Sequence, residues 1–201
     1  EELAERAAPS DEVLIYFAGN GASGLAPISS ASGASVDSAS LSGGGVAPIT
    51  TTRAVFLATD SRSEAPWASG LTLEDLGAAL GGIRARRVLL VLDVGFGSPE
   101  EGGRTFALGD EALGATLEPN AMAKALGLGQ GRAALFAGRP SQTALALPGP
   151  QAGLLTYAFD LGVRGSADLN ADGRVDLNEL SAYVQREVRG RAGLEGFEQD
   201  P

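Results

Sequence analysis

The sequence predicts an α/β fold, in which a mostly parallel β-sheet is flanked by helices, as a single domain over residues 1–190. Short apolar runs that suit strands buried on both faces alternate with segments whose apolar residues recur at helical spacing. Such alternation is typical of β–α–β units. The 201 residues, 44% of them hydrophobic and 20% charged, are enough for a substantial core and ordinary for a globular protein.

The first part of the chain is expected to hold the end of a helix and one strand. Residues 1–8 are typical of a helix that Pro9 stops. Residues 13–18 form an apolar run rich in β-branched and aromatic side chains, which predicts a buried strand ending at 19–21. Residues 22–52 are mostly Ser, Gly and Ala, so we expect a long loop there, either plain surface or a partner-binding lid.

A second strand, a capped helix and a third strand follow. Residues 53–58 and 87–93 are the two strand candidates, and the second of them ends in an acid. Between them, Thr72 with Asp75 three residues later has the spacing of a capping box, which marks the start of a helix. Residues 97–104, rich in Gly and Glu, predict a loop.

The C-terminal half is predicted to contain three helices and one more strand. Residues 119–128 begin with a proline, which suits the first turn of a helix. The apolar run at 132–138 predicts a strand, and the stripes within 151–163 and 177–190 predict helices. Residues 191–201 are polar, and we expect this tail to fray.

Composition excludes several function classes. The chain has no cysteine and no histidine, so it supplies no disulfide, no Cys/His zinc site, no thiolate nucleophile and no imidazole base. Its net charge of −10 disfavours nucleic-acid binding. No apolar stretch is long enough for a membrane span, and residues 1–6 lack the features of a signal peptide. The cellular compartment stays open.

The most specific motif is a calcium-binding pattern at residues 168–179. Its twelve positions match the EF-hand loop, with Gly173 at the sharp turn. Ca²⁺ prefers six to eight oxygen ligands, which one such loop can supply. A single loop beside core helices predicts a structural calcium clamp for the last helix, and a loop of the same shape without metal is the alternative. The predicted ligands are Asp168, Asn170, Asp172, Arg174 through its carbonyl, Asp176 and Glu179.

Four segments, taken in order, resemble a known family. They are the strand ends at 16–21 and 92–97, the strand and following loop at 136–144, and the helix start at 153–158. Together with the acidic loop before Glu179, they resemble bacterial caspase-like, metacaspase-type peptidase domains over roughly residues 1–190. The resemblance implies a caspase-like sheet with its site at the carboxyl ends of the parallel strands.

The resemblance also implies that the catalytic pair is lost. The family's catalytic His falls on Asn20 and its catalytic Cys on Gly95, so the chain is similar to a pseudo-peptidase. Three remnants of the substrate pocket are expected: Gly21 at an oxyanion-hole position, Asp93 at the acid that receives a basic substrate side chain, and Ser141 where a partner acid would stand. Asp93 has the alternative role of a strand-end acid that accepts backbone N–H bonds.

The family's first strand has no counterpart in this chain. We therefore expect a protein partner or a missing N-terminal segment to complete the sheet. The predicted function is a non-catalytic, Ca²⁺-stabilised binding or scaffold module, with a peptide as the ligand that the pocket implies. Two alternatives remain: a calcium-stabilised extracellular structural or adhesive domain, and a hydrolase whose acid–base pair is Asp60 and Asp93.

Overall fold

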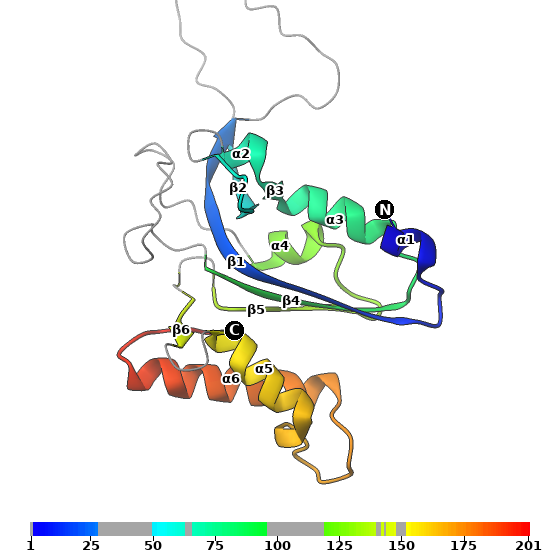
Figure 1. Ribbon diagram of the computed structural model, residues 1–201, viewed down its shortest axis with the longest axis vertical. Coiled ribbons are helices and arrows are strands. Elements are labelled where there is room, and N and C mark those ends of the chain that lie inside the picture. The colour runs from blue at the N-terminus through cyan, green and yellow to red at the C-terminus, as the bar shows by residue number, and fades with distance from the viewer. Residues whose placement is uncertain are drawn as a thin grey trace, which may run out of the picture.

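The computed structural model describes residues 2–27, 50–62, 66–95, 119–139, 142, 144–147 and 152–201. Within these residues a mixed five-stranded sheet has helices on both faces (Figure 1), which confirms the predicted α/β class. The strands of this part of the chain are β1 (Glu12–Pro27), β2 (Thr50–Leu57), β3 (Leu71–Thr72), β4 (Arg87–Gly95), β5 (Arg132–Phe136), β6 (Ala146–Leu147) and β7 (Ala152–Gly153). Its helices are α1 (Glu2–Arg6), α2 (Pro66–Ser69), α3 (Leu73–Gly81), α4 (Pro119–Ala125), α5 (Leu154–Leu161) and α6 (Leu177–Leu194).

The sheet has the strand order β3-β2-β1-β4-β5. Strands β1, β4 and β5 are parallel, and β4 lies between the other two. Burial on both faces explains the nearly continuous apolar sequence of β4, because a central parallel strand has no solvent-facing side. Figure 1 shows α3 and α4 on one face of these strands and α5 and α6 on the other.

Strand β1 differs from its prediction. The expected end of the strand at 19–21 is wrong. The strand continues to Pro27, and its second half pairs with the antiparallel strand β2 in a hairpin. The loop predicted at 22–52 is therefore wrong at its ends, where 22–27 and 50–52 are strand. Hydrogen bonds between the two strands of the hairpin stabilise the extended backbone of these residues, although their Ser- and Gly-rich sequence has little strand propensity of its own. Residues 28–49 and the loop predicted at 97–104 lie outside the described residues.

Each face of the sheet has its own apolar core, so the molecule has three layers. The core between the sheet and α3 and α4 includes Phe56, Leu80, Leu90, Leu92, Met122 and Leu126. The core between the sheet and α5 and α6 includes Val91, Leu135, Leu154, Leu155, Val184 and Val188. Helices α5 and α6 cover β4 and β5 more fully than β1, whose Leu14 and Tyr16 remain about half exposed.

Both ends of α3 are hydrogen-bonded by side chains. The predicted cap is confirmed, since Thr72 Oγ1 accepts a bond from the Asp75 backbone N–H at 3.1 Å. At the other end, the Arg132 guanidinium of β5 donates to the carbonyl oxygens of Leu80 at 2.9 Å and Ile83 at 2.8 Å. Arg132 thus adds side-chain donors to carbonyls at the end of α3, and it joins this helix to the sheet.

The C-terminal half forms a helical layer that ends differently from the prediction. Helix α5 is shorter than 151–163 and continues into a π-helical turn at Gly162–Ser166. Helix α6 is longer than 177–190, and the tail after it does not fray as expected: Gln199 is 1% exposed. No helix in the described ranges is long and apolar enough to cross a membrane.

Helices α3 and α4 approach each other at Gly77, and replacing it by alanine is expected to destabilise the fold. A Cβ there would lie 1.9 Å from the Ala125 carbonyl oxygen, so the two helices would have to move apart. We expect urea unfolding to show a loss of about 2 kcal/mol. Gly81 in the same helix has open space around its Cβ position, so Gly81→Ala should be neutral or stabilising by up to about 1 kcal/mol. Equal effects of the two substitutions would contradict this assignment.

Candidate functional site: the carboxyl ends of β1 and β4

The two positions to which the resemblance assigns the lost catalytic pair lie side by side. Strands β1 and β4 are parallel and in register, so Asn20 is the Cα partner of Gly95 at their carboxyl ends. Asn20 is exposed, and Gly95 is half-buried. A Cβ on Gly95 would lie 3.0 Å from the backbone nitrogen of Ala144, which leaves little room for a side chain. Neither position supplies a nucleophile or a base at neutral pH.

Asp93 is buried and holds the start of α5. The first turn of that helix has no side-chain cap of its own, because its N-cap is Gly153. Instead, Asp93 Oδ2 accepts a bond from the Thr156 backbone N–H at 3.0 Å and a second bond from the Thr156 hydroxyl. A Cβ on Gly153 would lie 2.0 Å from Asp93 Oδ2, so glycine is required for the carboxylate to approach this closely. The geometry matches the role of a strand-end acid that accepts backbone N–H bonds.

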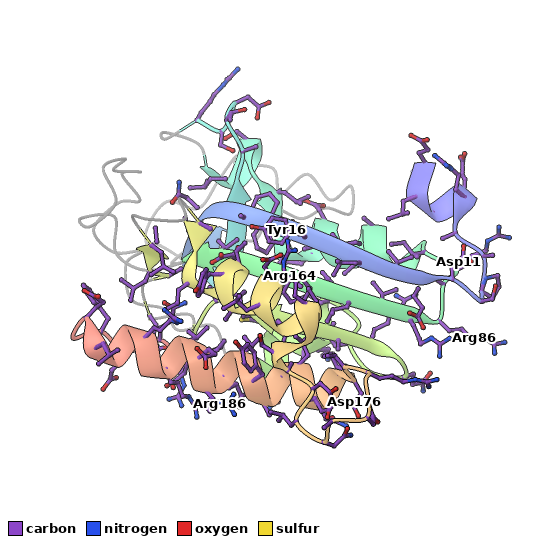
Figure 2. All side chains as sticks on the ribbon, turned by 60° about the horizontal axis from the view of Figure 1, so that its bottom comes forward. Asp11, Tyr16, Arg86, Arg164, Asp176 and Arg186 are labelled. Atoms are coloured by element: carbon purple, nitrogen blue, oxygen red, sulfur yellow. The ribbon has the colours of Figure 1, made fainter. Side chains whose placement is uncertain are left out.

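A chain of hydrogen bonds continues from Asp93 to β1. The Thr156 hydroxyl proton is used toward Asp93, so Tyr16 Oη donates to Thr156 Oγ1 over 2.7 Å. Burial raises the pKa of the Asp93 carboxyl above its ordinary value, and the two bonds from Thr156 partly oppose that rise. Figure 2 shows Tyr16 on β1 beside α5. The side chain that the resemblance assigns to substrate binding is thus engaged inside the fold.

Of the other two predicted pocket residues, the structure describes Gly21 alone. Gly21 is half-buried and pairs with Phe56 within the β1–β2 hairpin. Ser141 lies outside the described residues. Asp60 is exposed in the turn after β2, whereas the hydrogen bonds of Asp93 go to Thr156. The geometry therefore gives no support to a hydrolase built on the two carboxylates.

A polar cluster after β5 was missed by the sequence analysis. The buried Gln199 side chain donates to the Ala137 carbonyl oxygen at 2.7 Å and accepts from the Leu145 backbone N–H at 3.0 Å. The neighbouring Asp200 forms ion pairs with Arg189 at 2.6 Å and Arg139 at 3.3 Å. No local pattern distinguishes these residues in a polar tail, because their partners are far away in the sequence.

The acidic loop at 168–179 folds around its own carboxylates. Asp168 accepts bonds from the backbone N–H groups of Asp172 and Gly173, and Gly173 has a φ of 81° at the sharp turn. Asp176 caps α6, and Glu179 returns a bond to the Asp176 backbone N–H at 3.0 Å, which completes a capping box. Both acids are therefore part of the start of the last helix (Asp176 is labelled in Figure 2).

The donor set of this loop fits a hard cation. The proposed ligand side chains offer carboxylate and amide oxygens, and two of these oxygens, Asp176 Oδ1 and Glu179 Oε1, already accept two backbone N–H bonds each. Among the described residues, no three acidic side chains are arranged so that they hold a metal ion as they stand. Calcium binding would replace or share the backbone N–H bonds that Asp168 and Glu179 accept. The side chains concerned are those of Asp168, Asn170, Asp172, Asp176 and Glu179, with the carbonyl of Arg174.

Comparisons of the chain with protein-family models, with curated proteins and with solved structures find no match. Function must therefore be inferred from the chain's own residues. The observations that bear on it are the pairing of Asn20 with Gly95, the engagement of Asp93 by α5, and the pairing of β1 along its two edges.

Proposed function

We propose that the chain is a non-catalytic, caspase-like binding module of the pseudo-peptidase type, stabilised by Ca²⁺. The observation that carries this proposal is the pairing of Asn20 with Gly95 at the carboxyl ends of two parallel strands. Ligand and catalytic sites collect at such ends in parallel sheets. Here Asn20 has an amide side chain, Gly95 has no side chain, and Asp93, the acid two residues before Gly95, caps a helix. These features support a binding site at the strand ends in which the two paired positions carry no reactive group.

Binding is proposed to occur along β1, which has an open edge at Glu12–Gly19. Over these residues β1 pairs with β4 on one side, while β2 on the other side begins its pairing only at Asn20. Within the described ranges no strand covers the second side of Glu12–Gly19. An unpaired strand edge presents backbone donors and acceptors in a row, which is the surface used in β-strand addition.

The register identifies which backbone groups face the open edge. In β4, Val88 donates to Gly131 and Leu92 accepts from Ala137, so even-numbered residues of β4 direct their backbone groups toward β5. Odd-numbered residues of β4 consequently face β1, where each bonds the two neighbours of its Cα partner. The partner of Leu89 is Leu14. Leu14, and with it every second residue of this stretch, therefore directs its N–H and C=O away from β4.

Side chains along the open edge are apolar on both faces of the sheet. Leu14 is 55% exposed and Tyr16 is 48% exposed on the α5 face. Val13, Ile15 and Phe17 on the opposite face are only partly buried against the core. An added strand would cover both sets, so the proposed ligand is an extended protein segment with apolar side chains. A partner protein, or a segment of the same polypeptide, can supply it.

Proline at Leu14 tests the proposed edge pairing. Leu14→Pro removes an N–H that faces the open edge and leaves the bonds to β4 in place, whereas Leu14→Thr keeps the N–H and changes only the side chain. Peptides selected from a displayed random dodecapeptide library on the native chain should bind the proline variant about tenfold or more weakly, as measured by fluorescence anisotropy. The threonine variant should lose much less.

Two results would contradict the proposed function. Selected peptides that bind the native chain and the Leu14→Pro variant equally would show that the open edge is not the binding surface. Mass spectrometry of the same peptides after long incubation is expected to find them intact. Cleavage at a peptide bond would show that the chain is an enzyme in spite of Asn20 and Gly95.

A further inference from the structure

The chain after α6 returns to the sheet and binds it through two consecutive residues. Residues 194–198 are exposed, and Gly196, with a φ of 80°, allows the sharp change of direction. The side chain that is then buried is polar: Gln199 is 1% exposed. A tail held only by the hydrophobic effect would instead bury Phe197, which is 41% exposed. The attachment is therefore specific to the chemistry of Gln199 and Asp200.

Backbone groups of the segment after β5 recognise both ends of the Gln199 carboxamide. Its nitrogen donates to the Ala137 carbonyl oxygen at 2.7 Å, and its oxygen accepts from the Leu145 N–H at 3.0 Å. A carboxylate in the same place would face the Ala137 carbonyl with no proton to donate. Gly138 provides the space, because a Cβ there would lie 3.3 Å from Gln199 Cγ.

The next residue, Asp200, binds a second set of groups. Its carboxylate pairs with Arg189 of α6 at 2.6 Å and with Arg139 at 3.3 Å. Gln142 donates to the same carboxylate at 3.2 Å and accepts from the Asp200 backbone N–H at 2.9 Å. A carboxamide on one residue and a carboxylate on the next are thus recognised by two separate groups of partners.

This cluster adjoins the carboxyl ends of the parallel strands. The segment that includes Leu145 also includes Ala144, whose backbone nitrogen lies against the Cβ position of Gly95. The tail is therefore held next to the pair of positions described above, at the edge where parallel sheets bind ligands. The cluster is separate from the open edge of β1, so it does not depend on the function proposed there.

We propose that Ala137, Gly138, Gln142, Leu145, Arg139 and Arg189 form a peptide-binding subsite for a glutamine–aspartate segment, which the chain's own Gln199–Asp200 occupies in cis. We call it the tail subsite. The ligand class is a peptide with a glutamine followed by an acidic residue. An attached tail competes with such a peptide at the high effective concentration of an intramolecular ligand, so the native chain should keep the tail subsite closed.

The test releases the tail and supplies the segment in trans. The full chain with Gln199→Glu places a carboxylate against the Ala137 carbonyl and should free the tail subsite, while Glu198→Gln changes an exposed neighbour and serves as the matched control. The probe is a synthetic peptide with the sequence of residues 195–201, labelled with fluorescein at its N-terminus. Fluorescence anisotropy should show the probe binding the Gln199→Glu chain about tenfold or more tightly than the native or control chain.

A change in the probe or in the tail subsite should remove most of the tighter binding to the Gln199→Glu chain. A probe with glutamate in place of glutamine should bind about tenfold more weakly, because it cannot donate to Ala137. Adding Gly138→Ala to the Gln199→Glu chain should also abolish binding, since it fills the space around Gln199 Cγ. If circular dichroism shows that the Gln199→Glu chain is unfolded, Asp200→Ala is used instead to weaken the tail. Equal binding to the native and released chains, or no binding to either up to about 1 mM, would overturn the proposal.

Discussion

Replacement of Asp93 by alanine is expected to lower the free energy of unfolding by about 2 kcal/mol. The carboxylate accepts two bonds from Thr156, one from the backbone N–H and one from the hydroxyl, and nothing in an alanine side chain replaces them. A buried donor without a partner costs about 1–3 kcal/mol, while loss of a desolvated charge offsets part of this. Urea unfolding of the variant at neutral pH measures the difference, and no change would show that Asp93 does not hold α5.

Asparagine at the same position separates the charge of Asp93 from its hydrogen bonds. Asp93→Asn keeps an acceptor for Thr156, so it should cost much less than Asp93→Ala. Burial raises the pKa of Asp93 in the folded state above its ordinary 3.8, so the folded chain binds that proton more tightly than the unfolded chain. Protonation of Asp93 therefore stabilises the native chain relative to Asp93→Asn. This contribution to the free energy of unfolding is full below about pH 3.8 and is lost as the pH rises through the pKa of Asp93 in the folded state. A relative stability that rises with pH would contradict this sign.

The parallel core of the fold could be predicted from the sequence because its signals are local. Strand β4 is buried on both faces, so its continuous apolar run by itself predicts a central strand. The start of α3 is marked by Thr72 and Asp75, and the start of α4 by Pro119. Each signal lies within a few residues of the element it defines, and each of these elements begins where it was expected, although α4 ends at Ala125 rather than at 128 and β4 ends at Gly95 rather than at 93.

The hairpin of β1 and β2 could not be predicted in this way, because its strands are stabilised by pairing. Residues 22–27 are dominated by small side chains and resemble a loop in composition, yet their backbone is paired with β2. The same holds for the tail, where Gln199 is buried only because Ala137 and Leu145 are presented by a distant segment. Polar burial of this kind has no sequence period, so only the folded chain reveals it.

The positions of the candidate site were predicted more accurately than its chemistry. Two strand ends were expected to bring Asn20 and Gly95 together, and the parallel register does so. Two alternatives for Asp93, a substrate-binding acid or an acceptor of backbone N–H bonds, could not be separated on sequence alone. The deciding partner is Thr156, which lies 63 residues further along the chain.

Addition of Ca²⁺ is expected to raise the melting temperature of the chain by roughly 5–10 °C. For a single loop with a dissociation constant of about 10 µM, 1 mM Ca²⁺ stabilises the folded state by about 2.7 kcal/mol, which corresponds to that shift for a chain of this size. The comparison is between chain treated with a calcium chelator and chain with excess Ca²⁺, followed by circular dichroism. Isothermal titration calorimetry gives the stoichiometry, which should be one ion per chain.

Glutamine at position 179 distinguishes calcium binding from the capping role of the loop. Glu179→Gln keeps one oxygen, which can still accept the Asp176 N–H bond, but its amide nitrogen cannot accept the bonds that Oε1 receives from Leu169 and Asn170, so the chelator-treated chain should lose about 1 kcal/mol of stability. It removes the carboxylate that would bind Ca²⁺ through both oxygens, so the affinity should fall about tenfold or more. Asn178→Ala alters a neighbouring side chain outside the predicted ligand set and should leave both properties unchanged.

Calcium is expected to stabilise the loop and α6 more than the rest of the fold. Glu179 Oε1 accepts bonds from the backbone N–H groups of Leu169 and Asn170, which join the loop to the helix start. Calcium must replace or share these bonds, so its stabilisation should be carried by the loop and α6 rather than by the distant sheet. Hydrogen exchange should therefore slow at residues 168–185 on calcium addition and stay constant in β4. An equal melting shift for the native chain and Glu179→Gln, or none for either, would contradict a calcium site in this loop.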